Sequence, residues 1–233
     1  MEISSKKIIF VQDIFNVKLM KFKKLIDRGA ELERINEALH REDTQFIVIY
    51  GRRRIGKSEL IKCIVKAQHK AIYFLSDTSS ETIQRVAFSK VAASVIDGFD
   101  KVIYPDWETL FRSFNNQLSE RMLVCLDEFP YLVKSCDVLP SIIQKLLNEK
   151  ILKFDLILCG SSQQLMHGYV LNRQSPLYGL ANEIIKMQPI PAQYMSMAME
   201  CDAVQAVEEY AIWGGVPRYW ELRRDYPDKE TAI

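Results

Sequence analysis

An eight-residue segment of the chain combines glycines, a lysine and a serine at a spacing suited to binding phosphate. Gly51–Ser58 reads GRRRIGKS and matches the pattern GxxxxGK[ST] in full. The glycines let the backbone curl so that successive N–H groups face phosphate oxygens, and a following helix adds its positive N-terminal end. At these positions Lys57 reaches the β- and γ-phosphates, and the Ser58 hydroxyl ligates Mg²⁺. The segment therefore predicts a binding site for a nucleoside triphosphate and magnesium.

Three consecutive arginines stand between the two glycines of this loop. An arginine there can contact phosphate, but loop residues between the glycines also face solvent or a neighbouring domain, and the sequence leaves both readings open. Lys57 is assigned a catalytic role as well, because it would hold the phosphates during transfer. The predicted nucleotide-binding residues are the loop and the residue after it: Gly51, Arg52, Arg53, Arg54, Ile55, Gly56, Lys57, Ser58 and Glu59.

A pair of acidic residues ends a second apolar run. Residues 122–126 read MLVCL, and Asp127 and Glu128 follow directly. A carboxylate at a strand end can hold the magnesium shell opposite the loop serine, which is the role predicted for Asp127. Glu128 is the predicted catalytic base, because it can orient and polarise an attacking water. An acidic pair after a strand can also be a solvated strand end, but its place downstream of the phosphate loop favours the catalytic reading.

A third apolar run ends in small polar residues. Residues 154–159 read FDLILC, and Gly160, Ser161 and Ser162 follow. In NTPases with a strand inserted between the phosphate-loop strand and the acidic strand, the inserted strand carries a polar side chain that senses the γ-phosphate. Ser161 is the predicted catalytic sensor, with Ser162 next to it. The alternative is a serine that caps a helix starting near residue 163, and the sequence does not separate the two.

Apolar runs alternate with amphipathic helical stretches over the first 190 residues. The runs are 46–50, 71–75, 122–126, 154–159 and, more weakly, 183–187; the helical stretches lie near 30–39, 57–68, 80–97, 107–119 and 138–149. Strands that are apolar on both faces and separated by helices indicate a parallel sheet covered on both sides. After residue 191 only helical patterns follow. We expect an N-terminal tail at 1–21, an α/β core at 22–190, and at 191–233 a helical lid or the start of a winged-helix region.

The composition excludes several classes of protein. With 48% hydrophobic and 26% charged residues among 233, the chain has ordinary globular usage, which excludes disordered and fibrous proteins. Lys+Arg 31 against Asp+Glu 30 gives +1, so no overall field attracts nucleic acid or a membrane. The five cysteines form no CxxC pair, which argues against a disulfide framework or a zinc site. No run approaches the roughly 20 apolar residues of a spanning helix, and we expect a cytoplasmic protein.

Several motifs, in this order, resemble the archaeal-type ATPases, which belong to the STAND group of P-loop NTPases related to AAA+ proteins. The motifs are FIVIYGRRRIGKSELI, LVCLDEFPYLV, LILCGSSQQLM, SPLYG and WGGVPRYW. The resemblance covers roughly residues 22–223. It implies an α/β fold of the ASCE type, with a five-stranded, mainly parallel sheet in the order 5-1-4-3-2. It also implies ATP or ADP and Mg²⁺ as cofactors.

The resemblance implies two further contacts with the nucleotide. Residues 26–28 match an entry segment whose backbone lies near the adenine, which makes Asp27 and Arg28 predicted cofactor-binding residues. Residues 214–217 match a GxP-type turn in which Pro217 packs on the base. Without the resemblance, Asp27 reads as a cap of the next helix, and Gly-Gly-x-Pro reads as a helix stop and a turn.

Two departures from the family pattern concern turnover and partners. Family members commonly carry an arginine directly after SPLYG, where this chain has Leu180. Slow turnover is therefore expected, unless Arg173 or a neighbouring subunit supplies the charge. Relatives typically continue into a further C-terminal domain, so we expect a protein partner or an output domain beyond residue 233. A homo-oligomer is left open, nucleic-acid binding lacks support, and no membrane partner is expected.

Two functions from different classes fit these observations. The first is a Mg-dependent ATPase that hydrolyses ATP to ADP and phosphate, as the motor or switch module of a STAND-type protein. The second is a regulatory module that binds ATP or ADP tightly with little or no turnover. Glu128 favours the first function, and Leu180 favours the second.

Overall fold

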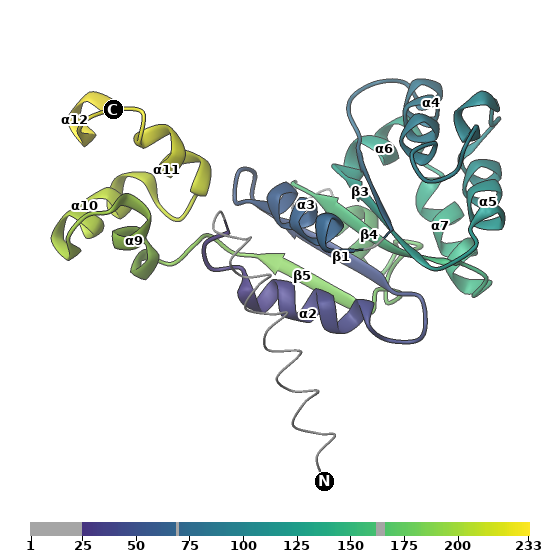
Figure 1. The fold of residues 1–233 in the computed structure, drawn as a ribbon, viewed down its shortest axis with the longest axis horizontal. Helices are drawn as coiled ribbons and strands as arrows, with labels where there is room; N and C mark the ends of the chain where they lie inside the picture. Colours follow the sequence, from purple (N-terminus) through teal and green to yellow (C-terminus); the bar gives the residue numbers. More distant parts are fainter. Residues whose placement is uncertain (1–24, 69, 162–165) are drawn as a thin grey trace, which may run out of the picture.

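Five parallel strands form the centre of the molecule (Figure 1). The computed structural model describes residues 25–68, 70–161 and 166–233, so the tail predicted at 1–21 and the position of Ser162 lie outside the described residues. The sheet order is β2-β3-β4-β1-β5, and every neighbouring pair is parallel. The predicted fold class and strand order are confirmed. The strands are β1 (Phe46–Gly51), β2 (Ala71–Leu75), β3 (Met122–Asp127), β4 (Phe154–Gly160) and β5 (Glu183–Met187).

Helices cover both faces of this sheet, because alternate residues of each central strand are apolar on both sides. On one face, α2 (Gly29–Leu39) and α3 (Lys57–Ala67) pack on side chains such as Ile47 and Ile157. The other face carries a larger core that includes Val48 and Leu156. Its helices are α4 (Glu81–Ala92), α5 (Trp107–Gln117), α6 (Phe129–Ser135) and α7 (Leu139–Asn148). The two layers hold the carboxyl ends of the strands at one edge, where the predicted site residues lie.

Two helices differ from the sequence-based expectation. The helix expected at 80–97 ends at Ala92 as α4, and a short 3-10 helix, η1 (Phe99–Lys101), follows. This break lets Phe99 become buried and stack on Tyr104, with ring centroids 4.7 Å apart. Helix α6 was not expected, because its apolar residues continue directly from the acidic pair. It has a proline in its first turn, where the missing N–H costs little.

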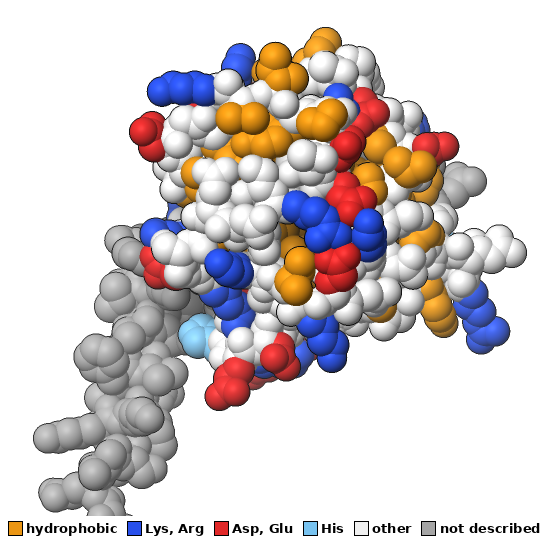
Figure 2. Space-filling model, turned by 90° about the vertical axis from the view of Figure 1, so that its right-hand side faces the viewer, with side chains coloured by type: hydrophobic (Ala, Val, Ile, Leu, Met, Phe, Trp, Pro, Cys, Tyr) orange, Lys and Arg blue, Asp and Glu red, His pale blue; other side chains and the backbone are white. Residues whose placement is uncertain are grey.

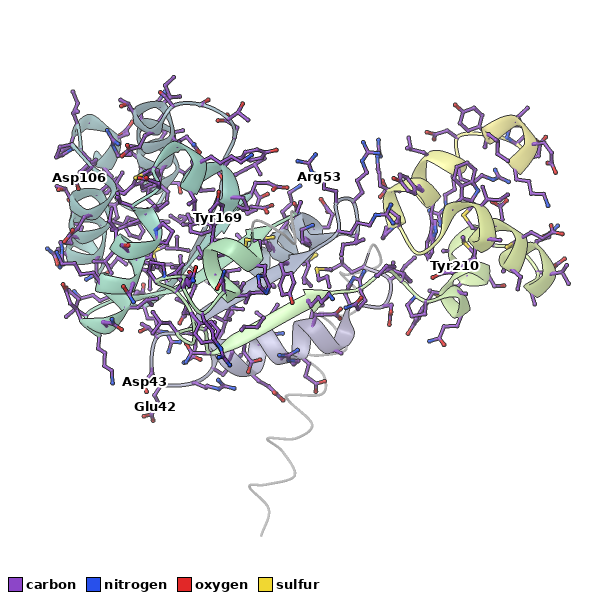
Figure 3. The ribbon with its side chains drawn as sticks, turned by 180° about the vertical axis from the view of Figure 1, so that it is seen from behind. Glu42, Asp43, Arg53, Asp106, Tyr169 and Tyr210 are labelled. Carbon is purple, nitrogen blue, oxygen red and sulfur yellow. The ribbon has the colours of Figure 1, made fainter. Side chains whose placement is uncertain are left out.

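The chain after β5 forms a second lobe, which we call the lid (residues 191–233). It contains η3 (Ala192–Tyr194), α9 (Met195–Met199), α10 (Ala203–Trp213), α11 (Pro217–Arg223) and α12 (Lys229–Ala232). Its own small core includes Met195 and Trp220 together with Ile190 of the linker. Tyr210 of α10, labelled in Figure 3, donates to the carbonyl oxygen of Ile190 at 3.0 Å. The domain boundary between 190 and 191 stays a prediction, which this separate core supports.

On the face shown in Figure 2, acidic and basic side chains lie interspersed with apolar ones and are not gathered by sign. Among the helices of the described ranges, none combines the length and the apolar composition that crossing a bilayer demands.

Candidate functional site

The phosphate loop connects β1 to α3 through two glycines with different physical requirements. A Cβ on Gly51 would lie 2.6 Å from the carbonyl oxygen of Met187 on the neighbouring strand, so no larger residue fits there. Gly56 has a φ of 93°, a backbone conformation that residues with a side chain rarely adopt, and it stands directly before α3. Arg54 also has a positive φ, of 69°. This curled backbone places Lys57 at the first position of α3.

The Lys57 side chain lies folded back over this loop. It is 4% exposed, and its Nζ donates to the carbonyl oxygens of Gly51 at 3.1 Å and Arg52 at 2.8 Å. Burial lowers the pKa of the Lys57 ammonium, and the nearby charges of Glu128 and Asp127 oppose that shift. An ammonium has three N–H donors, so one remains for a ligand.

Asp127 is the centre of a network of hydrogen bonds that joins β2, β3 and the start of α3. Its side chain is fully buried. One carboxylate oxygen, Oδ2, accepts from the Ser58 hydroxyl and from the Tyr73 hydroxyl, each at 2.7 Å, and Oδ1 accepts from the Glu128 N–H at 2.8 Å. The structure thus brings together the two predicted metal-binding residues, Ser58 and Asp127.

Tyr73 is a site residue that sequence reasoning missed, because it looks like an ordinary apolar member of β2. Burial and the hydrogen bond to Asp127 raise the pKa of its hydroxyl well above the usual value, so it acts as a donor at any physiological pH. Ser76, just after β2, was also missed. Its hydroxyl donates to the carbonyl oxygens of Asp127 at 2.6 Å and Glu128 at 2.8 Å and holds the end of β3 in place.

Glu128 and Ser161, the predicted base and sensor, are in direct contact. The Ser161 hydroxyl donates to Glu128 Oε1 at 2.5 Å, and the Ser161 N–H lies 3.4 Å from Oε2. Glu128 stands between β3 and α6 with a φ of 54°, which is a strained conformation for a residue that is not glycine. The contact joins the ends of β3 and β4 at the position where the γ-phosphate of a nucleotide is expected.

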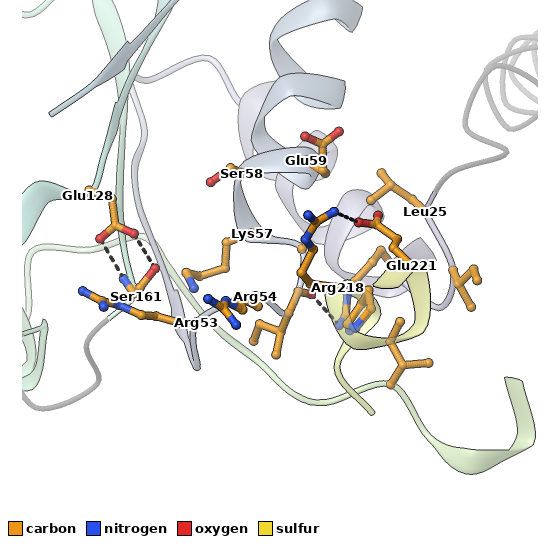
Figure 4. Close-up of a pocket in the computed structure, with 16 residues that line it drawn as sticks. Leu25, Arg53, Arg54, Lys57, Ser58, Glu59, Glu128, Ser161, Arg218 and Glu221 are labelled. Carbon is orange, nitrogen blue, oxygen red and sulfur yellow. Dashed lines mark hydrogen bonds and ion pairs between the residues drawn. The ribbon is translucent and has the colours of Figure 1, made fainter. Parts of the chain in front are cut away.

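A cavity of about 510 Å³ lies between the core and the lid, and its size suits a nucleotide (Figure 4). The lid and linker contribute Ile190, Pro217, Arg218 and Glu221, and the segment before α2 contributes Leu25 and Ile26. The predicted site residues that line it are Arg28, Arg53, Arg54, Ile55, Gly56, Lys57, Ser58, Glu59, Glu128, Ser161 and Pro217. Asp127 lies behind Ser58, and Gly51, Arg52 and Asp27 are not among the lining residues.

Arg28 lines this cavity, but its guanidinium is engaged in holding the protein together. It donates to the carbonyl oxygens of Ile55 at 3.1 Å and Gln188 at 2.9 Å, and it is 3% exposed. It therefore ties the phosphate loop to the segment after β5. The reading of Asp27 as a helix cap is wrong, because the residue at that position is Arg28 and no side chain caps α2.

The other arginines near the nucleotide site point in different directions. Arg53 donates to the Tyr131 hydroxyl at 3.0 Å, whereas the Arg54 guanidinium lies 6.0 Å from the centre of the Tyr219 ring in the lid. Leu180, where family members commonly have arginine, packs against the larger core. Arg173 is exposed and is not among the described residues that line the cavity.

The donor set fits magnesium better than a metal held in a cage of protein ligands. Within residues 25–68, 70–161 and 166–233, no group of three or more His, Cys, Asp or Glu residues could hold a metal ion. A serine hydroxyl beside a carboxylate offers hard oxygen ligands, and Mg²⁺ in such sites takes its other ligands from water and phosphate.

Comparison with protein families identifies the chain at this point. A family described as an ATPase domain found predominantly in Archaea matches residues 25–221. The chain belongs to this family. This ATPase domain is also 33% identical over 213 residues to an uncharacterized protein of Methanocaldococcus jannaschii, a match that covers 88% of the chain. The match covers 46% of that protein, so the chain spans about half the length of its curated relative.

Solved structures share the fold of this ATPase domain. A Walker-type ATPase of Pyrococcus abyssi has a TM-score of 0.64 at 21% identity, covering 91% of this chain and 71% of the other. The ORC1 protein of Aeropyrum pernix in complex with DNA has 0.58 at 17% identity, covering 89% and 58%. The ORC2 protein of the same organism, in ADPNP–ADP complexes, has 0.55 at 15% identity, covering 89% and 58%. The predicted resemblance to archaeal-type ATPases is confirmed.

Proposed function

We propose that this ATPase domain binds Mg²⁺-ATP in the cavity between core and lid and hydrolyses it to ADP and phosphate. The observation that carries the proposal is the arrangement at the carboxyl ends of β1, β3 and β4. There a buried ammonium, a hydroxyl–carboxylate pair and a second carboxylate come together beside a cavity of nucleotide size. This is the set of groups that phosphoryl transfer to water requires.

The phosphate groups are held by the loop and by Lys57. Gly56, Lys57 and Ser58 at the start of α3 line the cavity, and the helix dipole there favours negative charge. The Lys57 ammonium would bind the β- and γ-phosphates. Their negative charge would offset part of the cost of burying the ammonium away from water. Leu25, Ile26, Ile190 and Pro217 form an apolar wall suited to a purine ring.

Ser58 and Asp127 are the residues that would hold magnesium. When bound, the ion neutralises charge on the phosphate oxygens. Tyr73 and the Glu128 N–H restrain the Asp127 carboxylate through its remaining lone pairs, so its orientation is set before any ligand arrives. Such preorganisation avoids a reorganisation cost during the reaction.

Glu128 acts as the base in this proposal. Its carboxylate accepts a proton from water as the water oxygen attacks the γ-phosphorus, and the bond from that phosphorus to the β–γ bridging oxygen breaks with ADP leaving. The Ser161 hydroxyl holds the Glu128 carboxylate at the end of the cavity and is placed to contact a γ-phosphate oxygen. A general base must lie within hydrogen-bond distance of the proton that it removes, and Glu128 would meet this requirement for a water beside the γ-phosphate.

The test is single-turnover phosphate release from Mg-ATP, with bound nucleotide identified after denaturation. Lys57→Ala is expected to abolish nucleotide binding, and Glu128→Gln is expected to keep binding but to stop release. Lys62→Ala is the matched control for the lysine, because Lys62 lies on the exposed face of the same helix and pairs with Glu59. Unchanged nucleotide affinity in Lys57→Ala, or normal release from Glu128→Gln, would contradict the assigned roles.

A regulatory switch is the second function supported by a specific observation. The Glu128 carboxylate is already engaged by Ser161 through one good hydrogen bond and one long one, and these compete with its use as a base. Tight binding of ATP or ADP by the wild type without phosphate release would favour this function. In either case we propose that the domain is the motor or switch module of a longer assembly, acting on a partner protein or an output domain.

A further inference from the structure

The three arginines of the phosphate loop occupy three different environments. The Arg52 side chain is exposed and does not line the cavity. The Arg54 side chain contacts the lid through Tyr219. Arg53 lines the same cavity as Lys57 and its side chain bonds to α6. The three arginines of the loop therefore differ in their access to a bound nucleotide.

Arg53 lies at the end of the cavity where the chemistry is proposed to occur. Its Nη2 donates to the hydroxyl of Tyr131, and the backbone N–H of Tyr131 donates to the carbonyl oxygen of Glu128 at 2.9 Å. Arg53 is therefore tied to the first turn of the helix that begins at the proposed base. Figure 4 shows the Arg53 side chain beside Ser161, with Glu128 and Lys57 around it. Burial is the main cause of the lowered pKa of Lys57, and the positive charge of Arg53 lowers that pKa further as the smallest of the effects on it.

The reaction requires a cation at this end of the site. Charge on the transferred phosphoryl group spreads over its three outer oxygens, and an arginine commonly stabilises it. Two N–H donors of Lys57 already bond to the loop, Leu180 packs against the larger core, and Arg173 does not line the cavity. Among the described residues that line the cavity on the side of Glu128 and Ser161, Arg53 is the arginine in reach.

We propose that Arg53 is a catalytic residue, whose guanidinium contacts the γ-phosphoryl oxygens and stabilises the transition state, and that Tyr131 is a positioning residue that holds it there. The inference rests on the proposed ATPase function. The Arg53–Tyr131 bond joins a charged donor to a neutral hydroxyl at an exposed position. A guanidinium has five N–H donors, so Arg53 can keep its bond to Tyr131 through Nη2 while its other N–H groups form charged hydrogen bonds to phosphate oxygens.

The experiment compares Arg53→Ala and Arg53→Lys with Lys62→Ala, which removes the same charge from an exposed side chain outside the cavity. Single-turnover phosphate release from Mg-ATP is measured together with the affinity for ADP alone and for ADP with aluminium fluoride. An arginine finger contributes about 10³–10⁵ in rate; because Arg53 is exposed, we expect Arg53→Ala to lose at least roughly tenfold in rate. Binding of ADP with aluminium fluoride weakens in parallel, while affinity for ADP alone changes little.

Tyr131→Phe separates positioning from a structural role. It is expected to lose less rate than Arg53→Ala, and the double variant is expected to lose no more than Arg53→Ala, since both changes act through one guanidinium. Additive losses in the double variant would overturn the role of Tyr131. Melting temperatures of all variants are compared with the wild type, so that misfolding is recognised.

Other outcomes decide against Arg53. Equal losses in Lys62→Ala and Arg53→Ala would reduce the effect to net charge and overturn the inference. A loss in Arg173→Ala with none in Arg53→Ala would assign the role to Arg173. A rate per chain that rises with protein concentration, with Arg53→Ala unaffected, would assign it to a neighbouring subunit. Normal release from both wild type and Arg53→Ala defeats this inference alone, whereas no release from the wild type defeats the proposed function and this inference with it.

Discussion

Gly215 of the lid contacts Ile190 of the linker at a point where no side chain fits. The Ile190 N–H donates to the carbonyl oxygen of Gly215 at 2.8 Å. A Cβ on Gly215 would lie 2.2 Å from the Ile190 oxygen and 2.7 Å from the Ile190 nitrogen. These are backbone atoms that cannot rotate away, so Gly215→Ala must separate the two segments. Ile190 is buried in the small core of the lid and also lines the cavity. Pro217, two residues after Gly215, lines the same cavity.

The expected loss of stability follows from these contacts. Losing the backbone hydrogen bond costs about 1 kcal/mol. Forcing a methyl group into packed backbone costs about 1–3 kcal/mol more. The free energy of unfolding should thus fall by roughly 2–4 kcal/mol, which for a protein of this size lowers the Tm by about 4–16 °C. Nucleotide affinity should fall as well, because the substitution separates Ile190 from Pro217.

The assay is thermal unfolding with and without ADP, together with calorimetric measurement of ADP affinity. Gly29→Ala is the matched control: Gly29 is the first residue of α2, and no atom lies within 4 Å of its added Cβ. This control should be neutral or slightly stabilising, because alanine is the better helix former. If Gly215→Ala melted together with Gly29→Ala and bound ADP equally well, the role assigned to the contact between Gly215 and Ile190 would be wrong.

Three further predictions test the site and the lid. Tyr73→Phe removes one donor to Asp127, so half-saturation of nucleotide binding should require more Mg²⁺; an unchanged requirement would contradict the restraint assigned to Tyr73. Burial lowers the pKa of Lys57, so the ammonium is lost at lower pH than in a free lysine. ADP affinity measured from pH 7 to 10 should therefore fall as the pH rises. An affinity that does not change with pH would contradict the role of the Lys57 ammonium in binding phosphate. Glu209→Ala removes the buried carboxylate that pairs with Arg223, whose side chain is 11% exposed, and should cost about 3 kcal/mol in denaturant unfolding; an unshifted midpoint would show that the pair contributes nothing.

The elements and the position of the site could be predicted from local sequence. The apolar runs at 46–50 and 122–126 fall within β1 and β3, because strands buried on both faces need continuous apolar residues. The loop at 51–58 and the acids at 127 and 128 were recognisable, because phosphate and magnesium demand particular residue types at close sequence spacing. The strand order came from the family resemblance and not from periodicity.

The tertiary structure alone decided which distant residues complete the site. Tyr73 reaches Asp127 across 54 positions because β2 and β3 are neighbours in the sheet, and nothing in a local apolar pattern marks a tyrosine for that role. Arg28 donates to the carbonyl oxygen of Gln188, 160 positions away in the sequence, so its guanidinium is engaged by backbone groups that no local pattern predicts. Arg53 contacts Tyr131 and Arg54 contacts Tyr219 because of where α6 and the lid pack. The chemistry of the loop depends on residues that are close in the sequence, so it could be predicted. The contacts between strands, helices and lid arise from tertiary packing, which the periodicity of the sequence does not predict.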